Sequence, residues 1–180
     1  MEKLNILDEQ GNILGQEYRD VIHQKGLLHG EVHVWCVTPE NELIFQHRAK
    51  DKDTYPDLLD ATAGGHVDLG ETYEESAIKE LKEETGLDAE PSELIFLRTE
   101  IRNSFDEVTG MTNHPRRNIY LLKRKVAIED LTVEAGKALG FVSYPVTTLL
   151  NLDEQEASKF IPTLLDEDGL SLFKDIEKKI

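Results

Sequence analysis

Cysteine and long apolar runs are scarce in this sequence. Cys36 is the only cysteine of the chain, so an intrachain disulfide is excluded and a reducing compartment is expected. No apolar run approaches the ~20 residues that a membrane helix needs. Residues 1–5 lack the apolar core of a signal peptide. We therefore expect a cytoplasmic protein with no membrane partner.

Positive charge is scarce as well. The 180 residues hold 20 Lys and Arg against 36 Asp and Glu, which makes a formal net charge of -16. Polymeric nucleic acid is therefore disfavoured as a partner, because neutralising its phosphates requires a basic surface. A small polyphosphate stays compatible, since a bound metal ion and a few local cations outweigh a distant field.

Length and composition indicate a globular chain with one domain, or one domain and an extension. Hydrophobic residues make up 39% and charged residues 31% of the sequence, a balance typical of soluble proteins. A chain of this length buries a sizeable core without a partner.

Residues 65–87 are predicted to form a glycine turn followed by a capped helix. Thr72 and Glu75 have the spacing of a capping box, so Thr72 is the expected N-cap. Gly86 follows the last periodic residue and is a good C-terminal stop. Apolar residues at helical spacing form one buried stripe: Ala77, Ile78 and Leu81.

Three glutamates share the opposite face of this helix. Glu80, Glu83 and Glu84 stand at i, i+3 and i+4, so their carboxylates converge within about one turn. Their mutual repulsion would be relieved by Mg²⁺ or Mn²⁺, because hard divalent cations prefer oxygen ligands. A solvated acidic face is the competing interpretation in so acidic a chain. The preceding glycines favour the metal, since they let the backbone approach a ligand and allow the Gly65 carbonyl to face the same ion.

The stretch resembles the Nudix box. That motif reads Gly, five residues, Glu, seven residues, Arg-Glu, an aliphatic residue, any residue, Glu-Glu, any residue, Gly and an aliphatic residue. The matching positions are Gly65, Glu71, Glu80, Leu81, Glu83, Glu84, Gly86 and Leu87. Lys79 stands where the family has Arg. At average residue usage, so many fixed positions match by chance less than about once in 10⁶ start positions.

The resemblance implies an α/β fold, a Nudix-type α/β/α sandwich with a mixed sheet. It also implies a divalent-metal-dependent hydrolase that cleaves a diphosphate linkage in a nucleoside diphosphate derivative or a related small pyrophosphate. Mg²⁺ is the expected cofactor, with Mn²⁺ as the alternative. The implied catalytic metal ligands are Glu80, Glu83, Glu84 and the Gly65 carbonyl. Glu71 and Lys79 would form a supporting ion pair, in which Lys79 keeps the charge of Arg but lacks its planar fork. Dimers are common among relatives, so a homodimer is an open expectation.

The first half of the chain is also similar to the isopentenyl diphosphate isomerases, a branch of the same superfamily. Three short matches carry this likeness: Leu28-His29, Gly65-His66 and Leu69-Gly70-Glu71. The isomerase uses a Cys two residues before the His that matches His66, and here Gly64 stands there. An isomerase lacking its positioned acid is therefore one alternative. A non-catalytic Nudix module that senses a nucleotide is another.

Strands are predicted before the box. Residues 4–14 read as a hairpin, followed by a short helix or linker over 18–25. Residues 29–38 and 42–47 read as a second hairpin, rich in aromatic and β-branched residues. We divide the chain into an N-terminal extension, residues 1–25, and a Nudix hydrolase domain, residues 26–180.

Strands and helices are predicted after the box. Strands are expected over 92–103 and 117–126, separated by a loop of roughly a dozen residues. A short strand over 141–143 precedes three helical segments, over 146–152, 154–165 and 170–179.

The candidate substrate-binding residues are Arg48, Lys52 and His66. Arg48 and Lys52 lie between a hairpin strand and the box and are suited to phosphate, with solvated loop charges as the alternative. His66 adjoins Gly65 and is expected to line the pocket. Four acids are candidates for an additional carboxylate that binds metal or activates water: Glu100, Asp106, Glu107 and Glu134. Their spacing does not choose among them.

Overall fold

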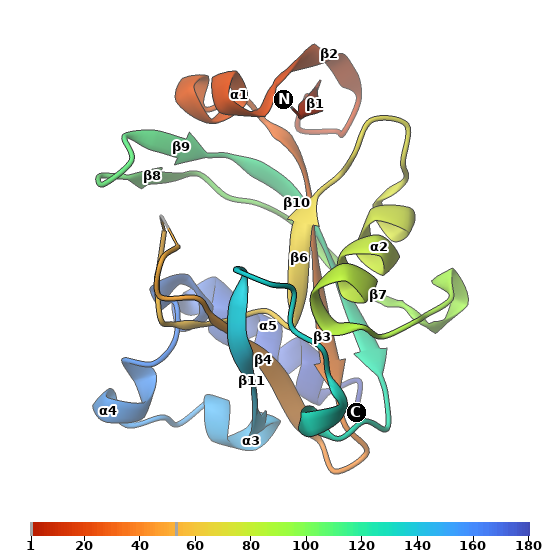
Figure 1. Cartoon of the computed structure of the whole chain (residues 1–180), viewed down its shortest axis with the longest axis vertical. Coiled ribbons are helices and arrows are strands. Elements are labelled where there is room, and N and C mark those ends of the chain that lie inside the picture. The colour runs from red at the N-terminus through yellow and green to blue at the C-terminus, as the bar shows by residue number, and fades with distance from the viewer. Residues whose placement is uncertain (1, 53) are drawn as a thin grey trace.

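The computed structural model describes residues 2–52 and 54–180. In this part of the chain, a nine-stranded mixed sheet curls between helices on both faces, and a separate two-stranded sheet projects beside it (Figure 1). The α/β class predicted from the sequence is therefore confirmed.

Strand β3 (His29–Val37) is the centre of the sheet. It pairs in parallel with β10 (Pro115–Lys123), and β10 pairs antiparallel with β7 (Ile95–Ile101). Antiparallel β6 (Ala63–His66) also pairs with β3, so that Gly65 lies opposite Val32. The turn that opens the Nudix-like motif is thereby attached to the central strand.

The C-terminal end of β3 leads into the second half of the sheet. There β3 pairs antiparallel with β4 (Glu42–Arg48), which pairs in turn with β11 (Ala138–Pro145) and with the short β5 (Leu59–Asp60). The predicted hairpin of β3 and β4 is confirmed, and the strand expected over 141–143 extends to eight residues.

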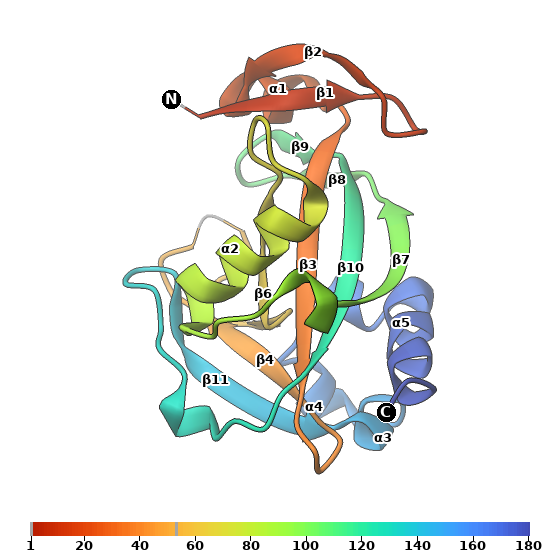
Figure 2. The ribbon, with the colours of Figure 1, turned by 90° about the vertical axis from the view of Figure 1, so that its right-hand side faces the viewer.

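Side chains alternate across β3 and serve two cores. Val32 and Val34 pack with Leu81 of helix α2 (Tyr73–Thr85). Trp35 belongs to the opposite core, where its ring meets Phe173 of helix α5 (Glu167–Glu177) edge-on with centroids 5.7 Å apart. Figure 2 shows α2 and α5 on opposite sides of β3 and β10.

The first residues add a hairpin to the edge of the sheet. β1 (Lys3–Leu7) and β2 (Ile13–Tyr18) pair antiparallel, as predicted, and are followed by α1 (Arg19–Lys25). β1 also pairs with β3 through Ile6 and His29. Gly26 ends α1 in the left-handed conformation, at φ 62°. The division of the chain at residues 25 and 26 stays a prediction.

The loop expected over residues 104–116 is a hairpin instead. β8 (Ser104–Asp106) pairs with β9 (Met111–Asn113). The Asp106 carboxylate accepts hydrogen bonds from the backbone N–H groups of Val108 and Thr109, at 2.7 and 3.1 Å, and so closes the turn locally.

The helical C-terminus is more broken than predicted. α3 (Val146–Leu149) and α4 (Glu154–Ala157) have four residues each. The helix expected over 154–165 stops early because Leu59 exchanges backbone hydrogen bonds with the segment at Lys159 and Ile161, and because Pro162 lacks the N–H that would continue the helix. Short 3₁₀ turns complete the described chain at Pro91–Glu93, Ile128–Asp130 and Pro162–Leu164.

Within the described residues, the helices are too short and too polar to cross a bilayer.

Candidate functional site

Helix α2 has defined ends that set the direction of its acidic face. The Glu75 N–H donates to Thr72 Oγ1 at 3.2 Å, and the Thr72 N–H donates to Glu75 Oε2 at 2.7 Å. This is the predicted capping box. At the other end Gly86 adopts φ 76°, and its N–H donates to the Lys82 carbonyl. The predicted stop is confirmed.

Glu84 is the most deeply held of the three glutamates. It is 6% exposed, and its Oε2 accepts hydrogen bonds from Gln46 Nε2 and the Gly64 N–H, both at 3.1 Å. Burial raises the pKa of Glu84, while the nearby Lys137 ammonium and the Gly64 and Gln46 hydrogen bonds act in the opposite direction. One carboxylate oxygen is therefore fixed by the sheet, and the other stays directed toward cations.

Glu80 lies against the glycine turn. Its Oε2 is buried and has no hydrogen-bond partner among the described residues. Burial first, then the neighbouring Glu84 carboxylate, raises the pKa of Glu80 to about 7. A β-carbon on Gly65 would stand 2.2 Å from Glu80 Oε1, so only glycine allows this approach. The structure thus presses a carboxylate with a free oxygen against the Gly65 backbone.

Glu83 completes the acidic face and is exposed. Its side chain makes no hydrogen bond or ion pair with the described residues. The three carboxylates lie within about one helical turn. Glu83 is free on the surface, Glu80 has a buried oxygen without a partner, and Glu84 is held by the sheet. This donor set consists of oxygens, which suits Mg²⁺ or Mn²⁺.

The supporting ion pair contains a partner that sequence reasoning missed. Lys79 Nζ contacts Asp68 Oδ2 most closely, and it lies 4.0 Å from Glu71 Oε1. The hydrogen bond to Asp68 raises the pKa of Lys79. Ser76 Oγ donates to Glu71 Oε2 at 2.6 Å. Lys79 therefore connects α2 to the box turn through two carboxylates. Apart from its position in that turn, nothing in the sequence identified Asp68 as the partner of Lys79.

A loop between β10 and β11 closes over the acidic face. Lys137 Nζ lies 3.4 Å from Glu84 Oε1 and 2.8 Å from Glu134 Oε2. Of the four acids named from the sequence, Glu134 is thus held beside Glu84 through Lys137. Glu100 instead pairs with Arg98 and Arg102, while Asp106 closes the hairpin turn and Glu107 is exposed in the same hairpin. Lys137 was not predicted.

A model of the NUDIX domain family matches residues 27–164 of this chain. The chain belongs to the Nudix family. It is 35% identical over 151 residues to an uncharacterized Nudix hydrolase of Clostridium acetobutylicum, an alignment that covers 82% of this chain and 72% of that protein. The family and the names of its relatives make this chain a Nudix hydrolase.

Solved structures agree on the fold. The chain is similar to a protein of Deinococcus radiodurans, with a TM-score of 0.67, 21% identity, and coverage of 96% of this chain and 98% of that one. It is also similar to the NUDIX domain of Shewanella oneidensis NrtR complexed with ADP ribose, with a TM-score of 0.58, 16% identity, and coverage of 84% and 86%. At these identities the likeness concerns architecture alone.

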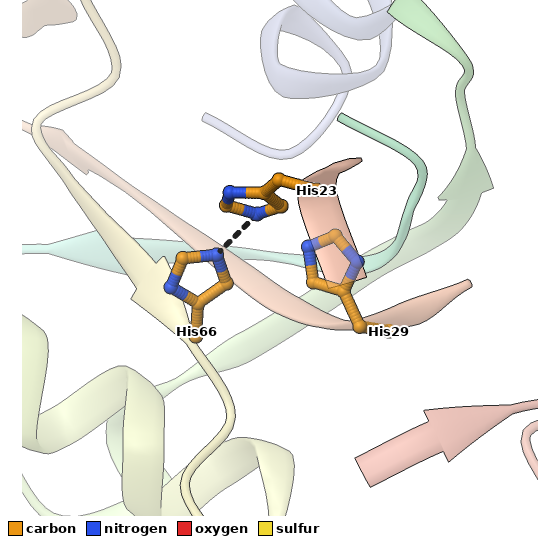
Figure 3. A group of neighbouring side chains, drawn as sticks. All are labelled: His23, His29 and His66. Atoms are coloured by element: carbon orange, nitrogen blue, oxygen red, sulfur yellow. Dashed lines mark hydrogen bonds between the residues drawn. The ribbon is translucent and has the colours of Figure 1, made fainter. Parts of the chain in front are cut away.

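Of the three substrate-binding candidates of the Nudix domain, Arg48 and Lys52 lie near each other, and His66 lies apart from them beside His23 (Figure 3). Arg48 donates to Asp60 Oδ2 at 3.0 Å and to the Thr54 and Tyr55 carbonyls. These hydrogen bonds stabilise the loop that follows β4. Lys52 lies on the Glu84 and Lys137 side, where burial and the neighbouring cations lower its pKa. His66 points away from Glu80, because side chains alternate along β6.

A part-buried ion pair lies on the His66 side of the Nudix sheet. Arg117 Nε donates to Glu31 Oε2 at 2.7 Å, between residues paired across β10 and β3. The side chains are 16% and 13% exposed. Burial alone would raise the pKa of Glu31, but Arg117 and other nearby positive charges outweigh it and lower the value to about 2. This pair could not be recognised without the strand register.

The position that would carry the isomerase cysteine has no room for a side chain. A β-carbon on Gly64 would lie 2.9 Å from the Val32 carbonyl oxygen and 2.7 Å from His33 Cδ2. The Gly64 N–H is also engaged with Glu84. The local backbone therefore serves the Nudix glutamates and leaves no space for a thiol.

Proposed function

We propose that this chain is a divalent-metal-dependent hydrolase that cleaves a diphosphate linkage in a nucleoside diphosphate derivative or a related small pyrophosphate. The observation that carries the proposal is the Glu80 carboxylate. It is buried against Gly65 with Oε2 unpartnered, next to the Glu84 carboxylate. Lys137 lies beside Glu84, but no cation contacts the Glu80 carboxylate among the described residues, and a divalent cation would relieve the repulsion between the two acids.

The residues fit Mg²⁺ or Mn²⁺ as the cofactor. The proposed ligands are Glu80, Glu83, Glu84 and the Gly65 carbonyl, an all-oxygen set that hard cations prefer. When bound, such an ion supplies positive charge that polarises the diphosphate and lowers the pKa of water. Asp68, Glu71 and Lys79 would hold the helix against the turn, so that ligand orientation depends on them.

The remaining roles belong to groups beside the acidic face. Glu134, which Lys137 connects to Glu84, is the proposed acceptor of the proton from the attacking water. Lys137 and Lys52 are the proposed cations that bind substrate phosphates. The Glu84 carboxylate lies near both and acts to raise the pKa of each. Attack on one phosphorus breaks the bridging P–O bond and releases a phosphomonoester, such as a mononucleotide. In this proposal Arg48 and His66 do not contact the substrate phosphates directly.

The test is a substrate panel with matched variants. Wild type should release phosphomonoester from a nucleotide, dinucleotide, nucleotide sugar or ADP-ribose in a Mg²⁺-dependent manner, ADP ribose being the ligand of the Shewanella relative. Glu83→Gln and Glu84→Gln should each lose at least about 10²-fold in rate. Glu129→Gln, an exposed acid far along the chain, should not. Wild-type turnover in either helix variant would refute the assignment.

The alternatives have their own readouts. Incubation with isopentenyl diphosphate should produce no dimethylallyl isomer, as expected from the crowded Gly64. A sensing module would bind a nucleotide from the panel without hydrolysing it. Location in the cytoplasm, a homodimer and the absence of a nucleic-acid partner stay predictions.

A further inference from the structure

A basic cavity lies where β3 and β10 end, at the end of the molecule away from β1 and α1 (Figure 2). Its volume is about 330 Å³, which is within the size range of small-ligand sites. Three consecutive cations line it: Lys123, Arg124 and Lys125. Among the described residues that form its walls none is acidic, although the chain holds 36 Asp and Glu against 20 Lys and Arg. The cavity is therefore locally positive on an acidic protein.

The two lysines of this cavity carry charge that the protein does not neutralise. Lys123 and Lys125 are exposed, and neither ammonium group has an ion-pair or hydrogen-bond partner in the part of the chain that the structure describes. Lys82, Lys159 and Lys178 are exposed as well, yet each contacts a carboxylate, at 2.7, 2.5 and 2.9 Å. The two unpaired ammonium groups are thus available to an anion from outside.

Arg124 holds the wall between the two lysines in place. Its Nη2 donates to the Asp88 carbonyl at 2.8 Å and lies 3.1 Å from Glu93 Oε1. Its backbone N–H donates to the Val37 carbonyl at 3.0 Å, which attaches this segment to the end of β3. The backbone that carries Lys123 and Lys125 is therefore already ordered, so a ligand does not have to order it on binding.

The turn between β3 and β4 contributes a neutral donor and apolar surface. Asn41 adopts φ 62°, which asparagine tolerates better than most residues, and its N–H donates to the Thr38 carbonyl at 3.0 Å. Its exposed side-chain amide makes no hydrogen bond with the described residues, so the NH₂ group is free to donate. The remaining lining is apolar: Val37, Pro39 and Ile180. A fitting ligand combines an anionic group with a ring or another apolar portion.

A neighbouring cavity of about 350 Å³ sets the direction of such a ligand. It shares Asn41 and Ile180 with the basic cavity, but it is lined by Glu40 and Glu177 and by no lysine. The two carboxylates repel an anion, because like charges disfavour each other at short range. The anionic group is therefore restricted to the lysine side, and an uncharged portion extends toward Asn41 and Ile180.

We propose that the basic cavity binds a phosphomonoester with a ring as its organic portion, such as a mononucleotide. A phosphomonoester carries a charge of about −1.5 to −2 at pH 7, which matches two unpaired ammonium groups better than a single carboxylate does. The ring would cover the apolar lining. The site is separate from the proposed hydrolytic site and does not rest on it, because its lining includes no residue of α2 and neither Lys52 nor Lys137.

The experiment is calorimetric titration of the full chain with AMP in excess chelator, so that no metal-dependent binding or hydrolysis takes place. We expect one AMP per chain. Inorganic phosphate should bind at least about 10-fold more weakly because it lacks the ring, and adenosine should not bind because it lacks the charge. Lys125→Glu should weaken AMP binding by at least about 10-fold, since an attractive charge becomes a repulsive one. Lys3→Glu makes the same charge change on the exposed face of β1 and should bind as wild type.

A second measurement checks folding and location. AMP should raise the thermal midpoint of wild type and of Lys3→Glu but not of Lys125→Glu, because a ligand that binds only the folded state stabilises it. Lys125 is exposed, so its variant is expected to fold. Lys137→Met, which alters the proposed hydrolytic site, should keep AMP affinity. The proposal is overturned by absence of AMP binding in wild type, equal affinity for inorganic phosphate, unchanged affinity in Lys125→Glu, or binding that is lost in Lys137→Met.

Discussion

Glu80 and Gly65 lie so close that a β-carbon on residue 65 would stand 2.2 Å from Glu80 Oε1. The carboxylate occupies the space that any other residue would fill. The glycine of the box is therefore required by a side chain 15 positions later in the sequence, in the middle of the helix that follows the turn. In the proposed metal site, this approach would let the Gly65 carbonyl and the Glu80 carboxylate face one ion.

Gly65→Ala should displace Glu80 and impair metal binding. We expect at least about 10²-fold loss of metal-dependent hydrolysis, comparable to loss of a catalytic group. Mg²⁺ or Mn²⁺ titration by calorimetry should show weaker uptake. Gly15→Ala is the control, because its nearest neighbour would be Ile6 Cδ1 at 4.0 Å. Wild-type affinity and rate in Gly65→Ala would show that this approach is not needed.

Asp68 and Lys79 should act as a unit. Asp68→Asn and Lys79→Met each remove the same short contact, so we expect each to reduce the rate by about 10- to 100-fold. The double variant should be little worse than either single one, since both members of an interacting pair are lost together. The measurement is kcat on the best substrate of the panel. Lys82→Met, which breaks an exposed pair with Asp88, should be neutral, and additive losses would contradict the coupling.

Lys137→Met should weaken substrate binding more than it slows chemistry. Lys137 is the cation nearest Glu84, at 3.4 Å, and we expect a KM increase of about 10-fold, equivalent to one charge-assisted contact of about 1.4 kcal/mol. Lys82→Met is again the control, because Lys82 is exposed and pairs with Asp88. An unchanged KM with a reduced kcat would assign Lys137 to the chemical step instead.

The Glu31–Arg117 pair should contribute stability in a definite pH range. Glu31 has a pKa of about 2 in the folded chain against 4.5 for the free side chain, so the unfolded chain binds more protons at mildly acid pH. Its contribution is complete above about pH 4.5 and disappears as the pH falls toward 2. Urea unfolding at pH 7 should show Glu31→Gln destabilised by about 1–3 kcal/mol, because the part-buried Arg117 is left without its charged partner.

The comparison between pH 7 and pH 3 tests the same pair. The difference in unfolding free energy between wild type and Glu31→Gln should shrink as the pH falls, because protonated Glu31 resembles the glutamine. Glu129→Gln, at an exposed site, should show no such difference at either pH. A gap that is constant with pH would mean that the variant disturbs packing and not charge.

The sequence alone determined the helix of the box and the spacing of its acids. The face predicted for them was wrong, because Glu84 is buried on the same side of the helix as Ala77 and Leu81. Capping by Thr72, termination at Gly86 and the common face of Glu80, Glu83 and Glu84 depend on contacts within one helix, whose 3.6-residue period is written directly in the residue order. The hairpins β1–β2 and β3–β4 were predictable for the same reason, whereas the β8–β9 hairpin was predicted as a loop. Each follows from alternation and turn residues that are neighbours along the chain.

The tertiary structure alone decided which distant groups meet that helix. Asp68 as the near partner of Lys79, Lys137 and Glu134 beside Glu84, and Arg48 bound to its own loop all depend on how loops close over a curled sheet. The three histidines of Figure 3, His23, His29 and His66, likewise come from α1, β3 and β6, and only the pairing of those elements brings their rings together. Contacts between residues far apart in the chain arise from packing and strand register, and neither has a local period that a sequence reveals.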